Sequence, residues 1–335
     1  MPAAARGCPE LVEGAAGQSH PDVANVLNNL GGIQEERGNY SGALGLFQRS
    51  VKIMTAVRDG EDISRLRVQS LSGPAGVLRA LGRYRRAETL LRQAITLATK
   101  ELGPKDPEVA SALNNLAVVY KYTGQFEVAK RLYWRALKIT EKALGRNHPE
   151  VATIYHNLGG LEHARGRYAG GKPYARRSVE IRERALGRNH PQTAADIAAL
   201  AAILDGQGKH EEAEASYRRA IDIFKRKLGR ENYDVAVNYN NLGALYYAQG
   251  KTRKAEQLYE LALAIKKTLL GPRHPDVAMT LNNLAMLYKS EEDYAAAKLL
   301  YERALAIFKI TLGPGHPKVI TSRDNYTALL REMGN

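Results

Sequence analysis

The sequence predicts an all-α protein built as a solenoid of antiparallel helix hairpins. Three observations lead to this prediction. A phrase of the kind "LNNLA" recurs along the chain, a His-Pro pair recurs at intervals of 42 residues, and small residues alternate with large ones at fixed positions of each repeat. A hairpin that cannot bury its apolar residues alone stacks on its neighbours, which forms one continuous core.

The repeats begin at regular intervals. His148 and His190 are 42 residues apart, as are His274 and His316, and each precedes a proline, while Asn232 keeps the register without one. We therefore expect a single domain over 20–335, with seven hairpins that start near residues 20, 64, 106, 148, 190, 232 and 274 and a capping helix over 316–334. Residues 1–19 are expected to be a flexible tail.

Each repeat consists of two predicted helices joined by a short turn. In the third repeat the apolar periodicity predicts helices over 107–122 and 126–144, separated by a turn at Gly124. Proline at the first helical position follows a capping residue, Asp106 or a histidine, and a glycine such as Gly145 suits the end of the second helix. The first helix of each repeat is called the A helix here, and the second the B helix.

Small residues mark where the helices touch. One position of the A helix is always small, at Ala117, Gly159, Ala201, Gly243 and Ala285. A position of the B helix carries a large ring instead, at Tyr133, Tyr217, Tyr259 and Tyr301. This complementary pattern predicts a tightly packed core between the helices.

Two repeats contain prolines that should disturb a helix. Gly73 and Pro74 in the second repeat predict a bend in its A helix, or a delayed start. Pro173 in the fourth repeat predicts that its B helix begins late. Gly73 and Pro74 also stand where an asparagine and a leucine are expected, so the second repeat interrupts the asparagine pattern.

Composition limits the class of protein. The 44% hydrophobic and 25% charged content permits a core and excludes global disorder. The single cysteine, Cys8, excludes an intramolecular disulfide and favours a reducing compartment. Neither a membrane span nor a secretory signal is predicted, because no long apolar run exists. We therefore expect a cytoplasmic protein.

The turns between the helices carry a family resemblance. A glycine is followed two residues later by an aromatic residue, as in Gly38 with Tyr40 and Gly124 with Phe126. With the small and large pattern, this resembles the tetratricopeptide repeat. The longer B helix and the "LG-x-x-HP" junction make this 42-residue form similar to the repeats of kinesin light chains and nephrocystin-like proteins. Over residues 20–334 the resemblance implies a right-handed superhelix and a non-catalytic interaction scaffold.

In this family the A helices line the concave wall, so the resemblance implies that the recurring asparagine pairs face a groove. A row of carboxamides can pair with the backbone of an extended peptide of any sequence, because each offers a donor and an acceptor. The second column is Asn29, Asn115, Asn157, Asn241, Asn283 and Asn325, and the first is Asn28, Asn114, His156, Asn240 and Asn282. Specificity is expected from Lys121, Tyr122, His163, Tyr247, Met286 and Lys289.

A structural role for the asparagines stays open. One residue of each pair can tie adjacent hairpins together without meeting a ligand, and the sequence does not separate this from peptide binding. In the fifth repeat Ala198 and Ala199 replace both members. This replacement predicts an apolar pocket in mid-groove, or simply a degenerate repeat.

The net charge of +14 invites comparison with nucleic-acid binders. The basic residues, however, gather in the B helices and junctions without interleaved aromatic residues for base stacking. A solvated basic surface that attracts an acidic peptide is therefore favoured over a nucleic-acid site. A regulatory subunit that senses a peptide or a small ligand is the other alternative, and self-association through an end helix is possible.

No arrangement of residues predicts catalysis. The five histidines before proline are expected to cap helices, and His156 and His163 are two helical turns apart, which is too far to share a zinc ion. The chain contains no phosphate-binding loop of the G-x-x-x-x-G-K-[ST] kind. We therefore expect a protein that is not an enzyme and needs neither a cofactor nor a metal.

Overall fold

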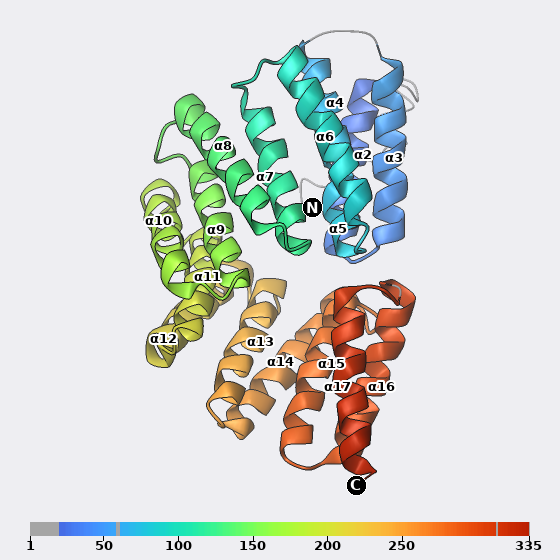
Figure 1. The fold of residues 1–335 in the computed structure, drawn as a ribbon, viewed down its shortest axis with the longest axis vertical. Helices are drawn as coiled ribbons and strands as arrows, with labels where there is room; N and C mark the ends of the chain where they lie inside the picture. Colours follow the sequence, from blue (N-terminus) through green and yellow to red (C-terminus); the bar gives the residue numbers. More distant parts are fainter. Residues whose placement is uncertain (1–19, 58–60, 313, 335) are drawn as a thin grey trace. The chain divides into compact units, whose positions relative to one another are not determined.

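The computed structural model describes residues 20–57, 61–312 and 314–334, and every regular element in these segments is a helix. The predicted tail, with Cys8, lies outside the described residues. The described residues fall into two compact units, one up to residue 146 and one from residue 147. The single solenoid predicted over 20–335 therefore stays a prediction, while the all-α class is confirmed (Figure 1).

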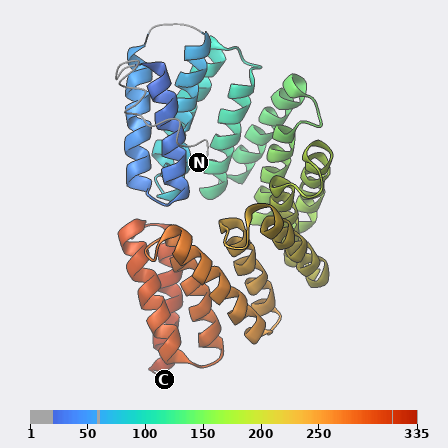
Figure 2. The same cartoon turned by 180° about the vertical axis from the view of Figure 1, so that it is seen from behind.

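The first unit contains three hairpins. Its helices are α2 (Pro21–Glu36), α3 (Tyr40–Ala56), α4 (Glu61–Ser72), α5 (Pro74–Ala80), α6 (Tyr84–Glu101), α7 (Pro107–Tyr122) and α8 (Phe126–Leu144). Neighbours in the chain lie side by side, as the pair α2 and α3 shows from behind (Figure 2). The A helix of the second repeat is divided at Gly73, which separates α4 from α5. The sequence therefore predicted the place of this interruption, at Gly73 and Pro74, while the backbone of Gly73 stays helical.

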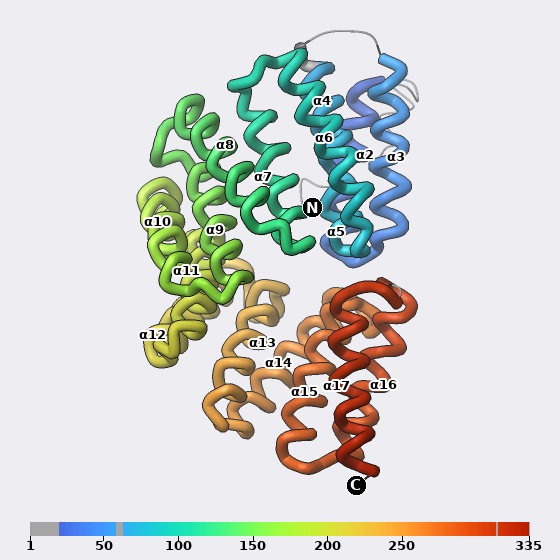
Figure 3. Tube along the Cα trace, in the orientation of Figure 1, coloured from blue at the N-terminus to red at the C-terminus, as the bar shows by residue number. Residues whose placement is uncertain are grey.

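The second unit contains four hairpins and a last helix. Its helices are α9 (Pro149–Ala164), α10 (Tyr168–Leu186), α11 (Pro191–Gly206), α12 (His210–Leu228), α13 (Tyr233–Ala248), α14 (Thr252–Leu270), α15 (Pro275–Ser290), α16 (Tyr294–Thr311) and α17 (Pro317–Met333). Short turns join the helices of each hairpin (Figure 3).

The late start predicted for the B helix of the fourth repeat is wrong. Helix α10 begins at Tyr168 and contains Pro173 in its second turn. A proline there removes one backbone hydrogen bond near the helix start. Close packing on α9 compensates, because a Cβ at Gly171 would lie only 3.2 Å from the carbonyl oxygen of Gly159.

Histidine side chains cap the A helices, as predicted. In each case Nδ1 accepts a hydrogen bond from the backbone N–H two residues later, at 3.0 to 3.2 Å. The capping histidines are His20, His148, His190, His274 and His316. Asp106 and Asn232 cap the A helices of their repeats in the same way, at 2.8 Å. These contacts satisfy N–H groups that a helix start leaves without a partner.

The contrast between small and large residues builds the core. The ring of Tyr259 is buried against Gly243, where a Cβ would approach it to 2.9 Å. Tyr133, Tyr217 and Tyr301 are buried in the same column. This packing fixes the distance between the two helices of a hairpin, and therefore the direction in which the A helices present their other face.

A hydrogen-bonded cluster links successive hairpins. In the second unit the hydroxyl of Tyr246 donates to Glu214 at 2.7 Å and accepts from Arg218 at 2.8 Å. Tyr120, Glu88 and Arg92 repeat this arrangement in the first unit. Tyr288 donates to Glu256 at 2.6 Å, but Glu260 occupies the position of the arginine. The hydrogen bond to Glu256, with burial and the nearby carboxylates of Glu256, Glu260 and Glu291, raises the pKa of Tyr288.

This difference gives a first testable prediction. The substitution Glu260→Arg should complete the cluster around Tyr288. It removes a carboxylate close to Glu256 and places an arginine four residues after Glu256, where the two can form an ion pair on one helix face. We expect the free energy of unfolding to rise by about 0.5 kcal/mol, measured by urea denaturation at pH 7. Glu260→Gln is the matched control and should give less of this gain. An unchanged or lower free energy of unfolding of the Glu260→Arg variant would show that an arginine at this position does not stabilise the link between hairpins.

Candidate functional site

The second asparagine column lies on the solvent-facing side of the A helices. Asn29 on α2 is exposed, and the others of this column are half-buried, at Asn115, Asn157, Asn241, Asn283 and Asn325. On α7 the exposed Ser111 and the half-buried Val118 share the face of Asn115, because residues three or four apart lie on one side of a helix. This face is accessible within each unit.

The first asparagine column points toward neighbouring hairpins. The Nδ2 of Asn28 donates to the hydroxyl of Ser70 on α4 at 3.0 Å. His156 pairs with the carboxylate of Asp196 on α11 at 2.7 Å. Asn282 is only 7% exposed. At Asn28 and His156 the geometry supports the inter-repeat role that the sequence left open.

Both columns also contact each other. The Nδ2 of Asn283 donates to Oδ1 of Asn240 at 3.1 Å and so connects α15 to α13. In the first unit Asn114 donates to its neighbour Asn115 at 3.4 Å. A first-column asparagine therefore contacts the carboxamide of Asn115 within its own pair, and that of Asn283 from the preceding repeat.

A hollow of about 410 Å³ lies beside Asn115 in the first unit. It is bordered by the divided A helix, α4 and α5, and by α7. Gly73 and Gly76 line it, with Phe47 and Glu35 packed where their Cβ atoms would lie, and Gln69 donates to Glu108 at 2.9 Å along its edge. The break between α4 and α5 thus forms a cavity with exposed carboxamide groups.

The sequence prediction missed this hollow, since it treated Gly73 and Pro74 only as a bend. The signal that could have revealed it is the pair of glycines three residues apart on the face that carries asparagine in other repeats.

A cationic and aromatic group adjoins this hollow. The ring of Tyr122, 51% exposed, stacks on Tyr84 with centroids 6.4 Å apart. Arg79, which also lines the hollow, lies over the Tyr122 ring at 5.1 Å, and Lys121 lies 5.3 Å from it. Burial lowers the pKa of Lys121. Two predicted specificity residues, Lys121 and Tyr122, are therefore together near Asn115.

The predicted specificity residues of the second unit are distributed differently. The hydroxyl of Tyr247 donates to the backbone oxygen of Met286 at 3.4 Å, and Asn282 approaches the Met286 sulfur at 3.7 Å. Lys289 pairs with Glu332 of α17 at 2.7 Å, and His163 meets the ring edge of Tyr168 at 5.3 Å. Tyr247 and Met286 thus form one cluster, whereas His163 and Lys289 lie in separate contacts.

The two alanines of the fifth repeat have different surroundings. Ala198 packs against buried residues of α11, α12 and α13, and Ala199 is half-buried. Neither lines the hollow beside Asn115 or the larger hollow in the second unit described below. The predicted apolar pocket at this point of the face stays a prediction.

Within the described segments, no three His, Cys, Asp or Glu side chains are grouped in a way that could hold a metal ion. In the same segments, none of the helices has the length and apolar character needed to cross a membrane.

Comparison with known proteins identifies the family. Models of the tetratricopeptide repeat match residues 23–57, 67–142, 108–170, 150–226, 199–268 and 234–310. The chain therefore belongs to the tetratricopeptide repeat family. A search of curated proteins gives no significant match.

Several solved structures are similar to this chain. BtubC (BKLC) from P. vanneervenii is 27% identical over 71% of this chain and 93% of that one, with a TM-score of 0.52. A putative kinesin light chain of Podospora anserina with nearly identical repeats is 25% identical over 63% and 98%, with a TM-score of 0.50. These relatives confirm the resemblance to kinesin light chain-like repeats.

A third structure shares the fold alone. The Rap conjugation gene regulator of plasmid pLS20, solved in complex with the Phr* peptide, is 17% identical over 89% of this chain and 77% of that one, with a TM-score of 0.64.

Proposed function

We propose that this protein is a non-catalytic interaction scaffold that binds an extended segment of a partner protein along the A helices. The observation that carries the proposal is the second asparagine column on their solvent-facing side, with Asn115 beside a hollow of about 410 Å³. The Phr* complex of the Rap regulator supports it, because a chain of this fold takes a peptide as its ligand. Because a chain with a single cysteine cannot form an intramolecular disulfide, the cytoplasm stays its predicted compartment.

The carboxamides would act on the peptide backbone. Each exposed asparagine offers one acceptor and two donors, which match the C=O and N–H groups of an extended chain. A neighbouring asparagine orients the exposed one at Asn115 and Asn283. In the first unit Lys121, Tyr122 and Arg79 would then select the side chains that accompany the bound backbone.

The proposal predicts a loss of binding when the exposed column is removed. The triple substitution Asn115→Ala, Asn241→Ala and Asn283→Ala should weaken partner binding at least about tenfold, because several hydrogen bonds are lost at once. Circular dichroism should show unchanged helicity. The partner is first captured from a lysate of the source cell and identified by mass spectrometry, and its binding segment is synthesised for fluorescence anisotropy with the full chain.

Two controls make this experiment decisive. Alanine substitutions at Asn28 and His156 should lower stability more than affinity, since these side chains bond to Ser70 and Asp196 of neighbouring hairpins. A peptide N-methylated at alternate backbone nitrogens should lose binding even though its side chains are intact. If the Asn115, Asn241 and Asn283 triple variant binds the partner normally, the peptide-binding proposal is wrong. It is also wrong if the parent and this variant both retain only nucleic acid that salt releases.

A further inference from the structure

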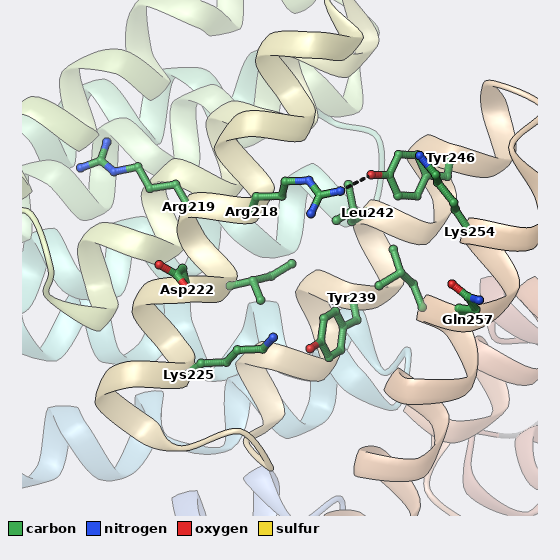
Figure 4. A pocket seen from close by; sticks show the side chains of 11 residues that line it. Arg218, Arg219, Asp222, Lys225, Tyr239, Leu242, Tyr246, Lys254 and Gln257 are labelled. Carbon is green, nitrogen blue, oxygen red and sulfur yellow. Dashed lines mark hydrogen bonds between the residues drawn. The ribbon is translucent and has the colours of Figure 1, made fainter.

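A larger hollow, of about 670 Å³, lies in the second unit between α12 and α14, over one face of α13 (Figure 4). From α13 it is lined by Tyr239, Leu242 and Tyr246. At 100° per residue these three lie on the side of α13 turned away from Asn241 and its neighbour Ala244. The hollow is therefore separate from the face that carries the asparagines.

Cations border this hollow on both helices. Arg218, Arg219 and Lys225 project from α12, and Lys254 projects from α14 (Figure 4). The one carboxylate in the lining, Asp222, pairs with Arg226 at 3.2 Å. The local charge is therefore strongly positive.

Two of these cations have no carboxylate of their own. Arg218 is held by Glu214 at 2.9 Å and Arg219 by Glu183 at 2.6 Å. In the described part of the chain, neither Lys225 nor Lys254 forms an ion pair. Both ammonium groups are available to an anion from outside.

Each of these two lysines lies over a tyrosine ring. The Nζ of Lys225 is 5.0 Å from the ring centroid of Tyr239, and that of Lys254 is 5.4 Å from the ring of Tyr246. The rings come from α13 and are not interleaved with these basic residues in the sequence. The rings hold each ammonium group at one end of the hollow.

The floor between the two ends is apolar. Ile221 and Leu242 are buried and Leu258 is half-buried beneath the opening. A volume of this size can enclose a large side chain of a partner. The hollow therefore combines an apolar floor with a cation over an aromatic ring at each end.

The spacing of the ends suits an extended peptide. Tyr239 and Tyr246 are two helical turns apart on α13, which corresponds to about 10 Å. Alternate residues of an extended strand lie on one side, so residues i and i+4 are about 13 Å apart with residue i+2 between them. Two carboxylates that lean inward from these outer positions can reach both lysines while the central side chain enters the hollow.

We propose that this hollow binds an acidic segment of a partner protein with the pattern acidic-x-apolar-x-acidic, independently of the asparagine-bearing face. Charge complementarity favours an acidic segment, because one lysine without an ion pair lies at each end of the apolar floor, Lys225 at one end and Lys254 at the other. The overall charge of +14 also favours encounter with acidic segments.

The test uses the full chain and short peptides labelled with a zwitterionic rhodamine. A Gly-Glu-Ser-Leu-Ser-Glu-Gly peptide should bind about tenfold more tightly, by fluorescence anisotropy, than a peptide with Gln for both Glu or with Ala for Leu. Equal affinity of all three peptides would overturn the proposal. So would complete displacement by millimolar inorganic phosphate, which would indicate a site for small anions.

Matched charge variants locate the site. Lys225→Gln with Lys254→Gln should weaken the Glu-Leu-Glu peptide about tenfold. Lys227→Gln with Arg253→Gln removes the same charge from exposed positions of the same two helices outside the lining, and should weaken it less than about twofold. Equal losses would show a diffuse field instead of a site. Loss of this peptide in the Asn115, Asn241 and Asn283 triple variant would place it on the other face and overturn the proposal.

Discussion

Replacement of Asp196 by asparagine is expected to destabilise the second unit by about 3 to 5 kcal/mol. The carboxylate of Asp196 is 2% exposed and accepts from Nε of Arg182 at 2.9 Å, while its other oxygen meets His156 at 2.7 Å. Arg182 is itself only 7% exposed. Without the carboxylate, a guanidinium is left buried with neutral partners alone, and desolvation of that charge is uncompensated.

The chain itself supplies the matched control for this prediction. Phe224 and Asn238 occupy, one repeat later, the positions of Arg182 and Asp196, and both are buried. The double substitution Arg182→Phe with Asp196→Asn should therefore recover most of the loss, to within about 1 kcal/mol of the parent. Urea denaturation followed by circular dichroism measures both variants at pH 7. A double variant as unstable as Asp196→Asn alone would show that the cluster stabilises through geometry and not through charge compensation.

Sequence predicted the features of this fold that depend on local signals. A histidine before proline caps the next helix wherever it occurs, because both requirements lie within three residues of chain. The divided helix at Gly73 follows from the same kind of local rule. Pro173 shows where such rules fail, since packing of Gly171 on Gly159 keeps α10 in register although local propensity opposes it.

The candidate sites were less predictable because they combine residues from different repeats. The asparagine columns were visible, since they recur with the repeat, but the direction of Asn28 toward Ser70 follows from the stacking of hairpins. The basic hollow of the second unit has no sequence signature. Lys225 and Lys254 approach Tyr239 and Tyr246 only because α12, α13 and α14 pack together, and no periodic pattern records that.

The stacking of hairpins also buries the ammonium group of Lys266, and we expect this burial to have a large effect on stability. It lies at the repeat position of Arg182, but Thr280 stands where Asp196 stands in that repeat. Its Nζ donates to the Thr280 hydroxyl at 3.0 Å, and the side chain is only 4% exposed. Burial lowers the pKa of Lys266 to about 8, although the carboxylate of Asp276 opposes this and Lys318 adds to it.

The contribution of Lys266 to the free energy of unfolding should therefore rise with pH above neutrality. The unfolded chain keeps the Lys266 proton up to about pH 10.5, whereas the folded chain releases it near pH 8. Between these values the unfolded state binds more protons at this group, so its contribution increases as pH rises, by at most about 3 kcal/mol, while the buried tyrosines, whose pKa is raised, act in the opposite direction toward pH 10. Below pH 8 the full cost of the buried charge is present. The nearby His274, whose pKa burial lowers, titrates outside this window.

The substitution Lys266→Met isolates this contribution. Methionine is a fitting replacement because Met54 occupies the equivalent position of the first repeat and is 1% exposed. At pH 7 we expect the variant to be more stable than the parent by about 1 to 3 kcal/mol, and the difference to shrink toward zero by pH 10. Urea denaturation at pH 7, 8, 9 and 10 measures it, with the exposed Lys309→Met as control. Parallel stability curves for parent and variant would show that Lys266 keeps its proton throughout, and that its ammonium group is compensated in the folded chain.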